Sequence, residues 1–288
     1  MILYLAIAGA CAEQKANAVD TSYTLSELSF NSVANHGTEA LVELMNSPTQ
    51  MILTTEPGSG EKLKAYAFDD STLPVFAPVV DEISENNKSP RGNCFGQNGN
   101  YLYVVRQGSP PLIRYTLVPA YNIGTSTPTT QTRSNALGSA QGIAMKDDGS
   151  IAYVVTSTGV TLLNLNTNWD ITSVGSTTSA TLGGADDDGD TITQHTAIRF
   201  KPDGTKVFVS YRVNTTPKVA EYALSTPWDL STKSFTSSLN IGPNLGLYTA
   251  TENAWIAGFD WNSDGSKLFV CSIHTDHPTG QTKVALYS

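Results

Sequence analysis

Charged residues are scarce in this sequence, and basic residues are scarcer than acidic ones. Only 15% of the 288 residues are charged, and 17 Lys and Arg stand against 26 Asp and Glu, for a formal net charge of −9. No basic cluster occurs, whereas neutralising phosphates requires several cations close together. The composition therefore argues against a nucleic-acid-binding protein, and we expect no nucleic acid among its partners.

Cysteine is rare as well. The three cysteines, Cys11, Cys94 and Cys271, show no C-x-x-C spacing, which excludes a cysteine-based zinc site and a dense disulfide framework. Their odd number favours buried thiols, although a bond between Cys11 and Cys271 remains open. The sequence also lacks a recognisable nucleophile–base pair, a Gly-rich phosphate loop and a zinc-binding helix motif. We therefore predict no catalytic residue, no cofactor-binding residue and no required cofactor.

Long hydrophobic runs are missing too. The most apolar segment, MILYLAIAG at residues 1–9, is shorter than the roughly 20 apolar residues of a membrane-spanning helix. No Lys or Arg precedes it, as a signal peptide would require, and the residues before Cys11 fit a lipoprotein signal poorly. We expect this run to be a buried strand that is retained, with a processed signal as the alternative.

The sequence does contain a phrase that occurs four times. Each copy has an apolar residue, an Asp-Gly or Asn-Gly dipeptide three residues later, and then a run of β-branched and aromatic residues. The glycines of the four dipeptides are Gly99, Gly149, Gly204 and Gly265. Such dipeptides between β-forming runs predict hairpins with a type I′ turn, in which both central residues have positive φ.

A second repeated phrase contains two large residues six positions apart. In EYALSTPWDLS these are Tyr222 and Trp228, and Asp229 and Leu230 follow. The pairs with the same spacing are Tyr115 with Tyr121 and Leu163 with Trp169. We expect these large residues to fill the space between neighbouring sheets, because large aromatic residues are mostly buried. The following Asp or Asn is expected to cap a turn.

Units of four short antiparallel strands that recur every ~50 residues indicate an all-β fold, a β-propeller. We predict one domain over residues 1–288, with units at about 1–35, 36–83, 84–135, 136–184, 185–245 and 246–288. The first unit lacks its first strand, with Tyr23 placed in its third, and the last unit lacks its fourth strand. This pattern predicts a ring closed by strands from both termini.

The number of blades stays open at this point. We favour six blades with incomplete terminal units. In a five-bladed alternative, residues 27–33 complete the last blade and residues 1–23 are accessory. In a third arrangement, a neighbouring subunit supplies the missing strands.

The repeats resemble those of two known groups of proteins. The runs AYVV at 152–155 and KVFVSY at 206–211 resemble the YVTN-type repeats of lactonase-like and surface-layer propellers. The segments DGTKVFVSY and VAEYALSTPWDLST within residues 203–232 more closely resemble propeller repeats in structural proteins of marine bacteriophages. The resemblance extends over about residues 90–288. It implies the propeller fold and a non-enzymatic virion structural or appendage protein, such as a phage tail or adhesion component.

The same resemblance implies a location and partners. The location is the virion, with secretion or the cell surface as the alternative. The partners are other virion or surface-assembly proteins in a multi-copy assembly, and a host receptor or glycan. The alternative function is a lactonase-like enzyme or ligand binder with a metal-assisted site in the channel. We expect partner contacts in the irregular stretches at 34–62, 175–195 and 231–253.

One acidic stretch is a candidate metal site. In GGADDDGDTIT, Asp186, Asp188 and Asp190 alternate along the chain, and three carboxylates so spaced could bind Ca²⁺. The EF-hand pattern fails, because Thr191 stands at the glycine position and Ala197 at the position of the closing Glu. Calcium is therefore the candidate ligand, with a solvated acidic turn as the alternative.

Histidines provide weaker candidates. His274, Asp276 and His277 share a predicted loop, but no third strong ligand accompanies the two histidines, so we expect an exposed surface there. His195 and Asn253 precede predicted inner strands and are expected to line the central channel, where propeller enzymes bind their ligands.

Overall fold

The computed structural model describes residues 23–28, 30–35, 39–40, 50–55, 62–67, 79–84, 90–106, 110–123, 129–133, 137, 140–214, 216–242, 254–262, 264–274 and 282–288. Their secondary structure is β-strands and tight turns, with two single-turn 3-10 helices, η1 (Leu25–Glu27) and η2 (Leu230–Thr232). Within these ranges, no helix has the length and apolar character needed to cross a membrane.

The described strands form five antiparallel sheets of four strands each. Sheet I contains β2 (Glu39–Ala40), β3 (Gln50–Thr55), β4 (Lys62–Ala67) and β5 (Val79–Ser84). Sheet II contains β6 (Pro90–Gly96), β7 (Tyr101–Arg106), β8 (Leu112–Thr116) and β9 (Thr129–Arg133). Sheet III contains β10 (Ala140–Met145), β11 (Ile151–Thr156), β12 (Gly159–Leu165) and β13 (Val174–Ala180). Sheet IV contains β14 (Ala197–Phe200), β15 (Lys206–Val213), β16 (Thr216–Leu224) and β17 (Lys233–Asn240). Sheet V contains β18 (Ala254–Trp261), β19 (Leu268–His274), β20 (Thr282–Tyr287) and, beside β20, β1 (Phe30–Asn35).

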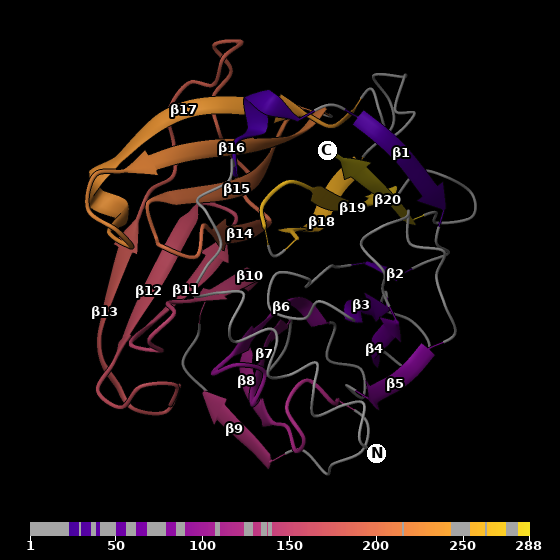
Figure 1. The fold of residues 1–288 in the computed structure, drawn as a ribbon. Coiled ribbons are helices and arrows are strands. Elements are labelled where there is room, and N and C mark those ends of the chain that lie inside the picture. Colours follow the sequence, from indigo (N-terminus) through magenta and orange to yellow (C-terminus); the bar gives the residue numbers. More distant parts are fainter. Residues whose placement is uncertain are drawn as a thin grey trace.

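The sheets stand around a common axis, with their first strands innermost (Figure 1). Strand β6 contacts β10, β10 contacts β14, and β14 contacts β18. Sheet I lies between sheets V and II, because β2 contacts β19 and β3 contacts β6. The fourth strands, β13, β17, β1, β5 and β9, lie at the periphery (Figure 1). This arrangement is a β-propeller, and it confirms the fold class predicted from the repeats.

The number of sheets among the described residues is one fewer than the six blades we favoured. The described strands form five sheets, not six, because β1 pairs with β20 instead of belonging to a sheet of its own. Val33 lies opposite Ala285, and Ala34 lies opposite Val284. Strands from the two ends of the described chain thus share sheet V, as the five-bladed alternative has it. The apolar run at residues 1–9 lies outside the described residues.

The Asp-Gly turns also differ from the prediction. At Asp148–Gly149 only the glycine has positive φ, at 72°, and its N–H donates to the carbonyl of Lys146 at 2.8 Å. This geometry is a type I turn whose last residue is a left-handed glycine, within a four-residue loop that the bond from the Lys146 N–H to the carbonyl of Ile151 closes at 2.9 Å. The bond of the glycine N–H is also made by Gly204 to Lys201 and by Gly265 to Asn262. Positive φ at both residues before the glycine occurs at Gln97 and Asn98, in the Asn-Gly unit.

The second large residue of each repeated phrase lies on the turn glycine of a sheet. A methyl group on Gly204 would approach the indole of Trp228 to 2.2 Å, so only a glycine fits beneath this ring. Trp169 covers Gly149 and Tyr121 covers Gly99 in the same way. These three aromatic residues have positive φ values of 65° to 68°. They are half-buried and cover their own sheet's turn. They also take part in the packing between sheets that we expected, because Trp169 lies against Gly96 of sheet II and Trp228 packs on the cluster that contains Tyr153 of sheet III.

Tyr23 is the fourth member of this set. It is buried, it has a φ of 27°, and its ring covers Gly265 of sheet V. It therefore occupies the place that Trp228 has in sheet IV. Our assignment of Tyr23 to a third strand was wrong, because Tyr-Thr-Leu-Ser matches both the Tyr-Ala-Leu-Ser of the third strand and the Trp-Asp-Leu-Ser of the turn.

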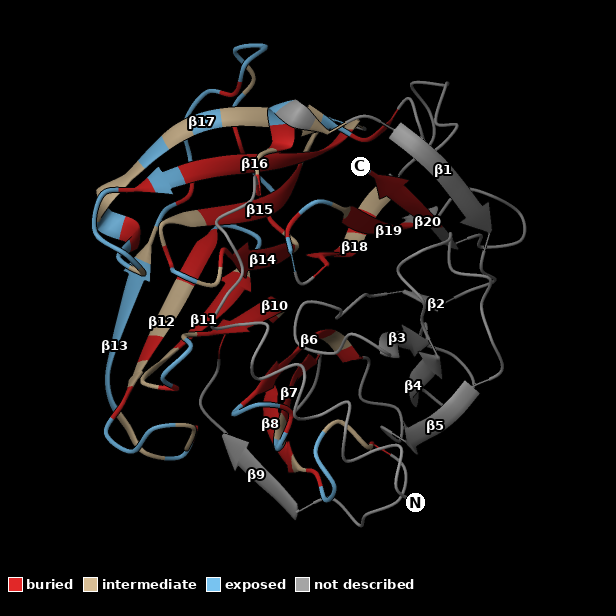
Figure 2. Ribbon diagram, in the orientation of Figure 1, coloured by how far each residue is buried: buried red, intermediate tan, exposed pale blue. Residues whose placement is uncertain are grey.

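The first large residue of each phrase is buried as predicted. Tyr222 lies between sheets III and IV, and its hydroxyl donates to the carbonyl of Leu182 at 2.7 Å. Tyr115 and Leu163 are also buried. Burial falls from the inner strands to the periphery, where β13 is mostly exposed (Figure 2).

Neighbouring sheets are joined through the backbone of the left-handed aromatic residues. The carbonyl of Trp169 in sheet III accepts from the Tyr103 hydroxyl at 2.7 Å and from Arg114 at 2.8 Å, both in sheet II. The carbonyl of Trp228 in sheet IV accepts from the Tyr153 hydroxyl of sheet III at 2.6 Å. Positive φ turns these carbonyls out of their own turn toward the preceding sheet.

Candidate functional sites

The axis of the propeller carries a buried arginine, Arg199 on β14. Its Nη1 donates to the carbonyls of Ile143 at 3.2 Å and Ile198 at 2.9 Å, and its Nη2 donates to the carbonyl of Asn93 at 3.2 Å. Its Nε lies 3.4 Å from Oδ1 of Asp260 on β18. One guanidinium thus connects the inner strands β6, β10, β14 and β18.

The local sequence explains why this group fits at the axis. A Cβ on Gly92 would lie 2.6 Å from the Cα of Gly142, and a Cβ on Gly142 would lie 2.9 Å from the Cα of Ala197. The inner strands therefore approach backbone to backbone, and one long side chain spans the centre. Asp260, which is fully buried, supplies the opposite charge that a buried guanidinium needs.

His195 is buried in the segment before β14, and Asn253 lies outside the described residues. Burial lowers the pKa of His195, while the nearby backbone of Leu182 and Ser157 acts in the opposite direction. These two neighbours belong to the loops of sheet III, so His195 lies at the boundary of sheets III and IV.

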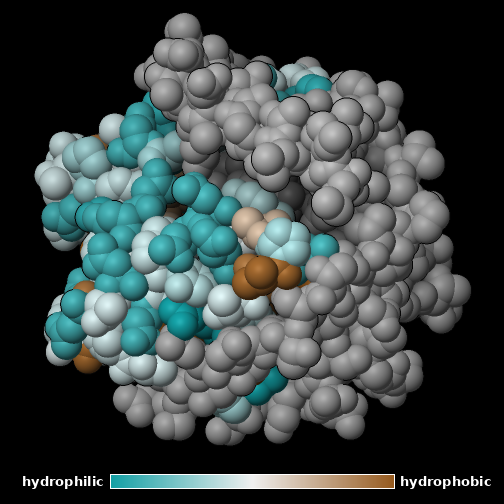
Figure 3. Space-filling model, turned by 60° about the horizontal axis from the view of Figure 1, so that its bottom comes forward, coloured by the Kyte–Doolittle hydropathy of each residue, from teal (hydrophilic) through white to brown (hydrophobic). Residues whose placement is uncertain are grey.

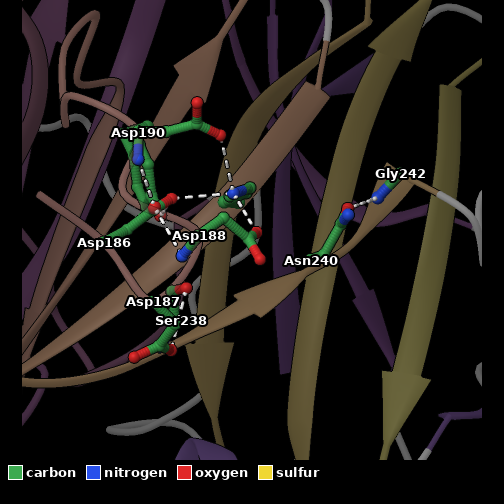
Figure 4. Close-up of polar contacts among 9 residues, drawn as sticks. Asp186, Asp187, Asp188, Asp190, Ser238, Asn240 and Gly242 are labelled. Atoms are coloured by element: carbon green, nitrogen blue, oxygen red, sulfur yellow. Dashed lines mark hydrogen bonds and ion pairs between the residues drawn. The ribbon is translucent and has the colours of Figure 1, made fainter.

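The three predicted metal ligands come together around a lysine (Figure 4). The ammonium of Lys218 on β16 lies 2.7 Å from Oδ2 of Asp186, 2.7 Å from Oδ2 of Asp188 and 3.2 Å from Oδ2 of Asp190. The hydroxyl of Tyr211 donates to the same oxygen of Asp186 at 2.7 Å. Lys218 and Asp186 are buried, whereas Asp188 is exposed.

Asp186 organises this acidic loop. Its Oδ1 accepts from the backbone N–H groups of Asp188 at 3.0 Å and of Asp190 at 2.9 Å, which turns the loop back on itself. Asp187 points the other way, and its carboxylate accepts from the N–H and the hydroxyl of Ser238 on β17 (Figure 4). The loop is thus fastened to both β16 and the peripheral strand of sheet IV.

The electrostatics of the cluster follow from its burial and its pairing. Burial alone would raise the pKa of Asp186, but the hydrogen bonds from Lys218 and Tyr211 outweigh it, and the pKa lies below its ordinary value. Burial would lower the pKa of Lys218, but the carboxylates of Asp186, Asp188 and Asp190 raise it above its ordinary value. The cluster therefore favours a carboxylate at Asp186 and an ammonium at Lys218.

The calcium hypothesis stays a prediction. The carboxylate oxygens of Asp186, Asp188 and Asp190 lie within 4.8 Å of one another, which suits a hard cation. The Lys218 ammonium already places a positive charge among them, so a metal ion would have to displace it. Sequence analysis did not identify this lysine as a neighbour of the acidic loop, because it lies 32 residues from Asp186.

The remaining histidine candidates are only partly placed. His274 is the last residue of β19, while Asp276 and His277 lie outside the described residues. Of the three stretches expected to contact partners, 175–195 is described throughout and contains most of β13 and the acidic loop.

Comparisons with known proteins show the fold. No protein-family model matches the chain, and no curated protein matches it. A chain of the nidogen–laminin complex is similar at 14% identity, covering 81% of this chain and 76% of that chain, with a TM-score of 0.50. The Cps50 (Swd1) β-propeller domain of Myceliophteria thermophila is similar at 7% identity, with 88% and 99% covered and a TM-score of 0.48. A putative 6-phosphogluconolactonase of Bacteroides uniformis is similar at 13% identity, with 82% and 66% covered and a TM-score of 0.42.

Proposed function

We propose that this protein is a non-catalytic binding module, and specifically a virion structural or appendage protein such as a phage tail or adhesion component. The observation that carries the proposal is that the guanidinium of Arg199 at the axis is already bound to neighbouring protein groups. Propeller enzymes need polar side chains that converge on a ligand in the channel. Here the guanidinium of Arg199 is engaged with Asp260 and with the carbonyls of Ile143 and Asn93.

The surface of the described part supports binding at the periphery. Strand β13 is uncharged and exposed over residues 175–179, where Ser and Thr hydroxyls face solvent. The described part of the face in Figure 3 is mainly hydrophilic, with hydrophobic colour confined to small spots. Such surfaces bind by hydrogen bonds, as polar protein interfaces and glycan sites do. The resemblance of residues 203–232 to bacteriophage propeller repeats supports the virion assignment.

The test is to find where the native protein resides. Particles purified from cultures of the source by density-gradient centrifugation are probed with an antibody against the chain, by immunoblotting and by immunogold electron microscopy. We expect the protein to sediment with the particles and the gold to decorate them. A protein found only in the soluble fraction, with undecorated particles, refutes the virion assignment.

The alternative is a ligand-binding or metal-assisted enzymatic site of the lactonase-like type, and the close carboxylates of Asp186, Asp188 and Asp190 favour it. It predicts lactone hydrolysis that depends on added Ca²⁺ and is lost in Asp186→Asn. We expect no turnover of gluconolactone above the uncatalysed rate, with or without Ca²⁺.

A further inference from the structure

Residues 23–28 and strand β1 complete sheet V from the far end of the sequence. The N–H of Leu25 donates to Oε2 of Glu221 at 2.9 Å, across 196 residues. The ammonium of Lys206 donates to the carbonyl of Tyr23 at 3.0 Å and to the hydroxyl of Thr24 at 2.9 Å. Strand β1 then pairs with β20. We call residues 23–35 the closing segment.

The site that receives the closing segment is built from sheet IV and sheet V alone. Lys206 and Glu221 form an ion pair at 3.0 Å, and the Glu221 side chain is 1% exposed. In sheets II and III the equivalent bond to the next sheet comes from the hydroxyls of Tyr103 and Tyr153. Phe208 stands at that position in sheet IV and has no hydroxyl, so Lys206 provides the donor instead.

Apolar contacts add a second layer of recognition. The ring of Tyr23 lies 5.5 Å from that of Trp261, and it covers Gly265, where a Cβ would approach it to 2.2 Å. Leu25 is buried in the cluster that contains Trp261 and Tyr287. The site therefore selects an aromatic residue, an aliphatic residue two positions later and a following strand.

We propose that the closing segment is exchangeable, so that two copies of this chain form a strand-exchanged dimer in which each completes sheet V of the other. Every contact named above is identical whether the segment comes from the same copy or from a second one, which is the condition for domain swapping. In sheets III and IV the third and fourth strands are consecutive in the chain and joined by a turn. In sheet V the fourth strand, β1, comes from a distant part of the sequence and is held beside β20 by non-covalent contacts alone.

The short connection between β1 and β2 makes the exchange feasible when the protein is concentrated. Only residues 36–38 separate β1 in sheet V from β2 in sheet I, and short connections between separately paired strands favour swapping. A segment tethered in its own copy has an effective concentration of the order of millimolar, so exchange needs protein concentrations approaching about 1 mM. A multi-copy assembly, as expected for a virion component, provides such concentrations.

An isotope-mixing experiment tests the exchange directly. The variant Val33→Cys with Ala285→Cys places cysteines at directly opposite positions of β1 and β20. Equal amounts of ¹⁴N- and ¹⁵N-labelled protein are mixed under reducing conditions, held just below the unfolding temperature at about 1 mM, then oxidised and digested. Peptides that join position 33 to position 285 are analysed by mass spectrometry.

We expect linked peptides of mixed isotope, approaching about half of all 33–285 linkages when every copy has exchanged. The proportion should fall toward zero in dilute protein. The single variants Val33→Cys and Ala285→Cys cannot form the linkage and serve as matched controls. Linkages of one isotope only, at every concentration, overturn the proposal.

A second variant tests the site itself without relying on new cysteines. Mixed ¹⁴N and ¹⁵N wild-type protein is incubated at about 1 mM, and native mass spectrometry of samples diluted immediately before measurement should show mixed dimers. Glu221→Gln weakens the hold on Leu25 and should make mixed dimers appear several times faster. Mixed dimers that form at the same rate in Glu221→Gln, or none in wild-type protein, contradict the assignment. Neither readout depends on whether the protein resides in a virion.

Discussion

Replacing Gly204 by alanine should destabilise the protein through two separable effects. The φ of Gly204 is 73°, and an L-residue in this left-handed region costs about 1–2 kcal/mol. The new Cβ would lie 2.2 Å from Nε1 of Trp228, so the indole must leave its position 4.9 Å from the ring of Phe200. Losing an aromatic pair costs about 0.5–1.5 kcal/mol. We expect a total loss of about 2–3 kcal/mol.

Two other glycines provide matched controls. Gly189 also has positive φ, at 80°, but nothing lies within 4 Å of its added Cβ, so Gly189→Ala should show the backbone cost alone. Gly183 has neither feature, and Gly183→Ala should change the unfolding free energy by less than about 0.5 kcal/mol. In a Trp228→Ala background, the additional cost of Gly204→Ala should fall to that of Gly189→Ala.

Urea denaturation followed by circular dichroism measures these differences. Thermal unfolding provides a second reading, in which about 2–3 kcal/mol corresponds to a midpoint lowered by roughly 4–12 °C for a chain of this size. If Gly204→Ala costs no more than Gly189→Ala in the wild-type background, the aromatic cover contributes nothing and the reasoning is refuted.

Three further predictions concern buried charges. Arg199→Met should lower the unfolding free energy by about 3–5 kcal/mol in urea denaturation, because it leaves Asp260 charged and buried. The double variant Arg199→Met with Asp260→Asn should lose less stability than the single variant. An equal or greater loss in the double variant would contradict the pairing. Lys218→Met removes the ammonium from among the carboxylates. Added Ca²⁺ should therefore raise the melting temperature of this variant by several degrees in differential scanning fluorimetry and leave that of the wild type unchanged. An equal response in both proteins would show that Lys218 does not compete with the metal. Because burial lowers the pKa of His195, the unfolded chain binds a proton more readily than the folded one. The unfolding free energy should therefore fall as pH drops through about 6.5. His195→Gln should flatten this decline, and an unchanged pH profile in the variant would assign the decline to other groups.

The sequence was sufficient to predict the propeller fold because the repeats place the same residues in the same environments. Tyr115, Leu163 and Tyr222 are buried at equivalent places, as the six-residue spacing predicted. The error at Tyr23 arose from two phrases of nearly identical composition, Tyr-x-Leu-Ser and Trp-x-Leu-Ser, which only three-dimensional pairing with Gly265 separates.

The polar interior could not be predicted for a different reason. Arg199 stands where the repeats of sheets II and III carry Cys94 and Ala144, and Lys218 stands where they carry Pro111 and Gly159, so neither residue belongs to the pattern that those repeats share. Their partners, Asp260 and Asp186, lie 61 and 32 residues away and meet them only after the sheets pack. Isolated charges in strands gave no indication that they would be buried.

The bonds from one sheet to the turn of the next end on main-chain oxygens of Trp169, Trp228 and Tyr23. A main-chain oxygen remains available as an acceptor after any substitution at its position that keeps the turn conformation. The donor to this oxygen differs between units: it is the phenol of Tyr153 at Trp228 and the ammonium of Lys206 at Tyr23. Repeated units joined through main-chain acceptors can therefore differ widely in amino-acid sequence and still pack on one another in the same way. A propeller of this kind can keep its fold after the similarity between its repeats is no longer visible in the sequence.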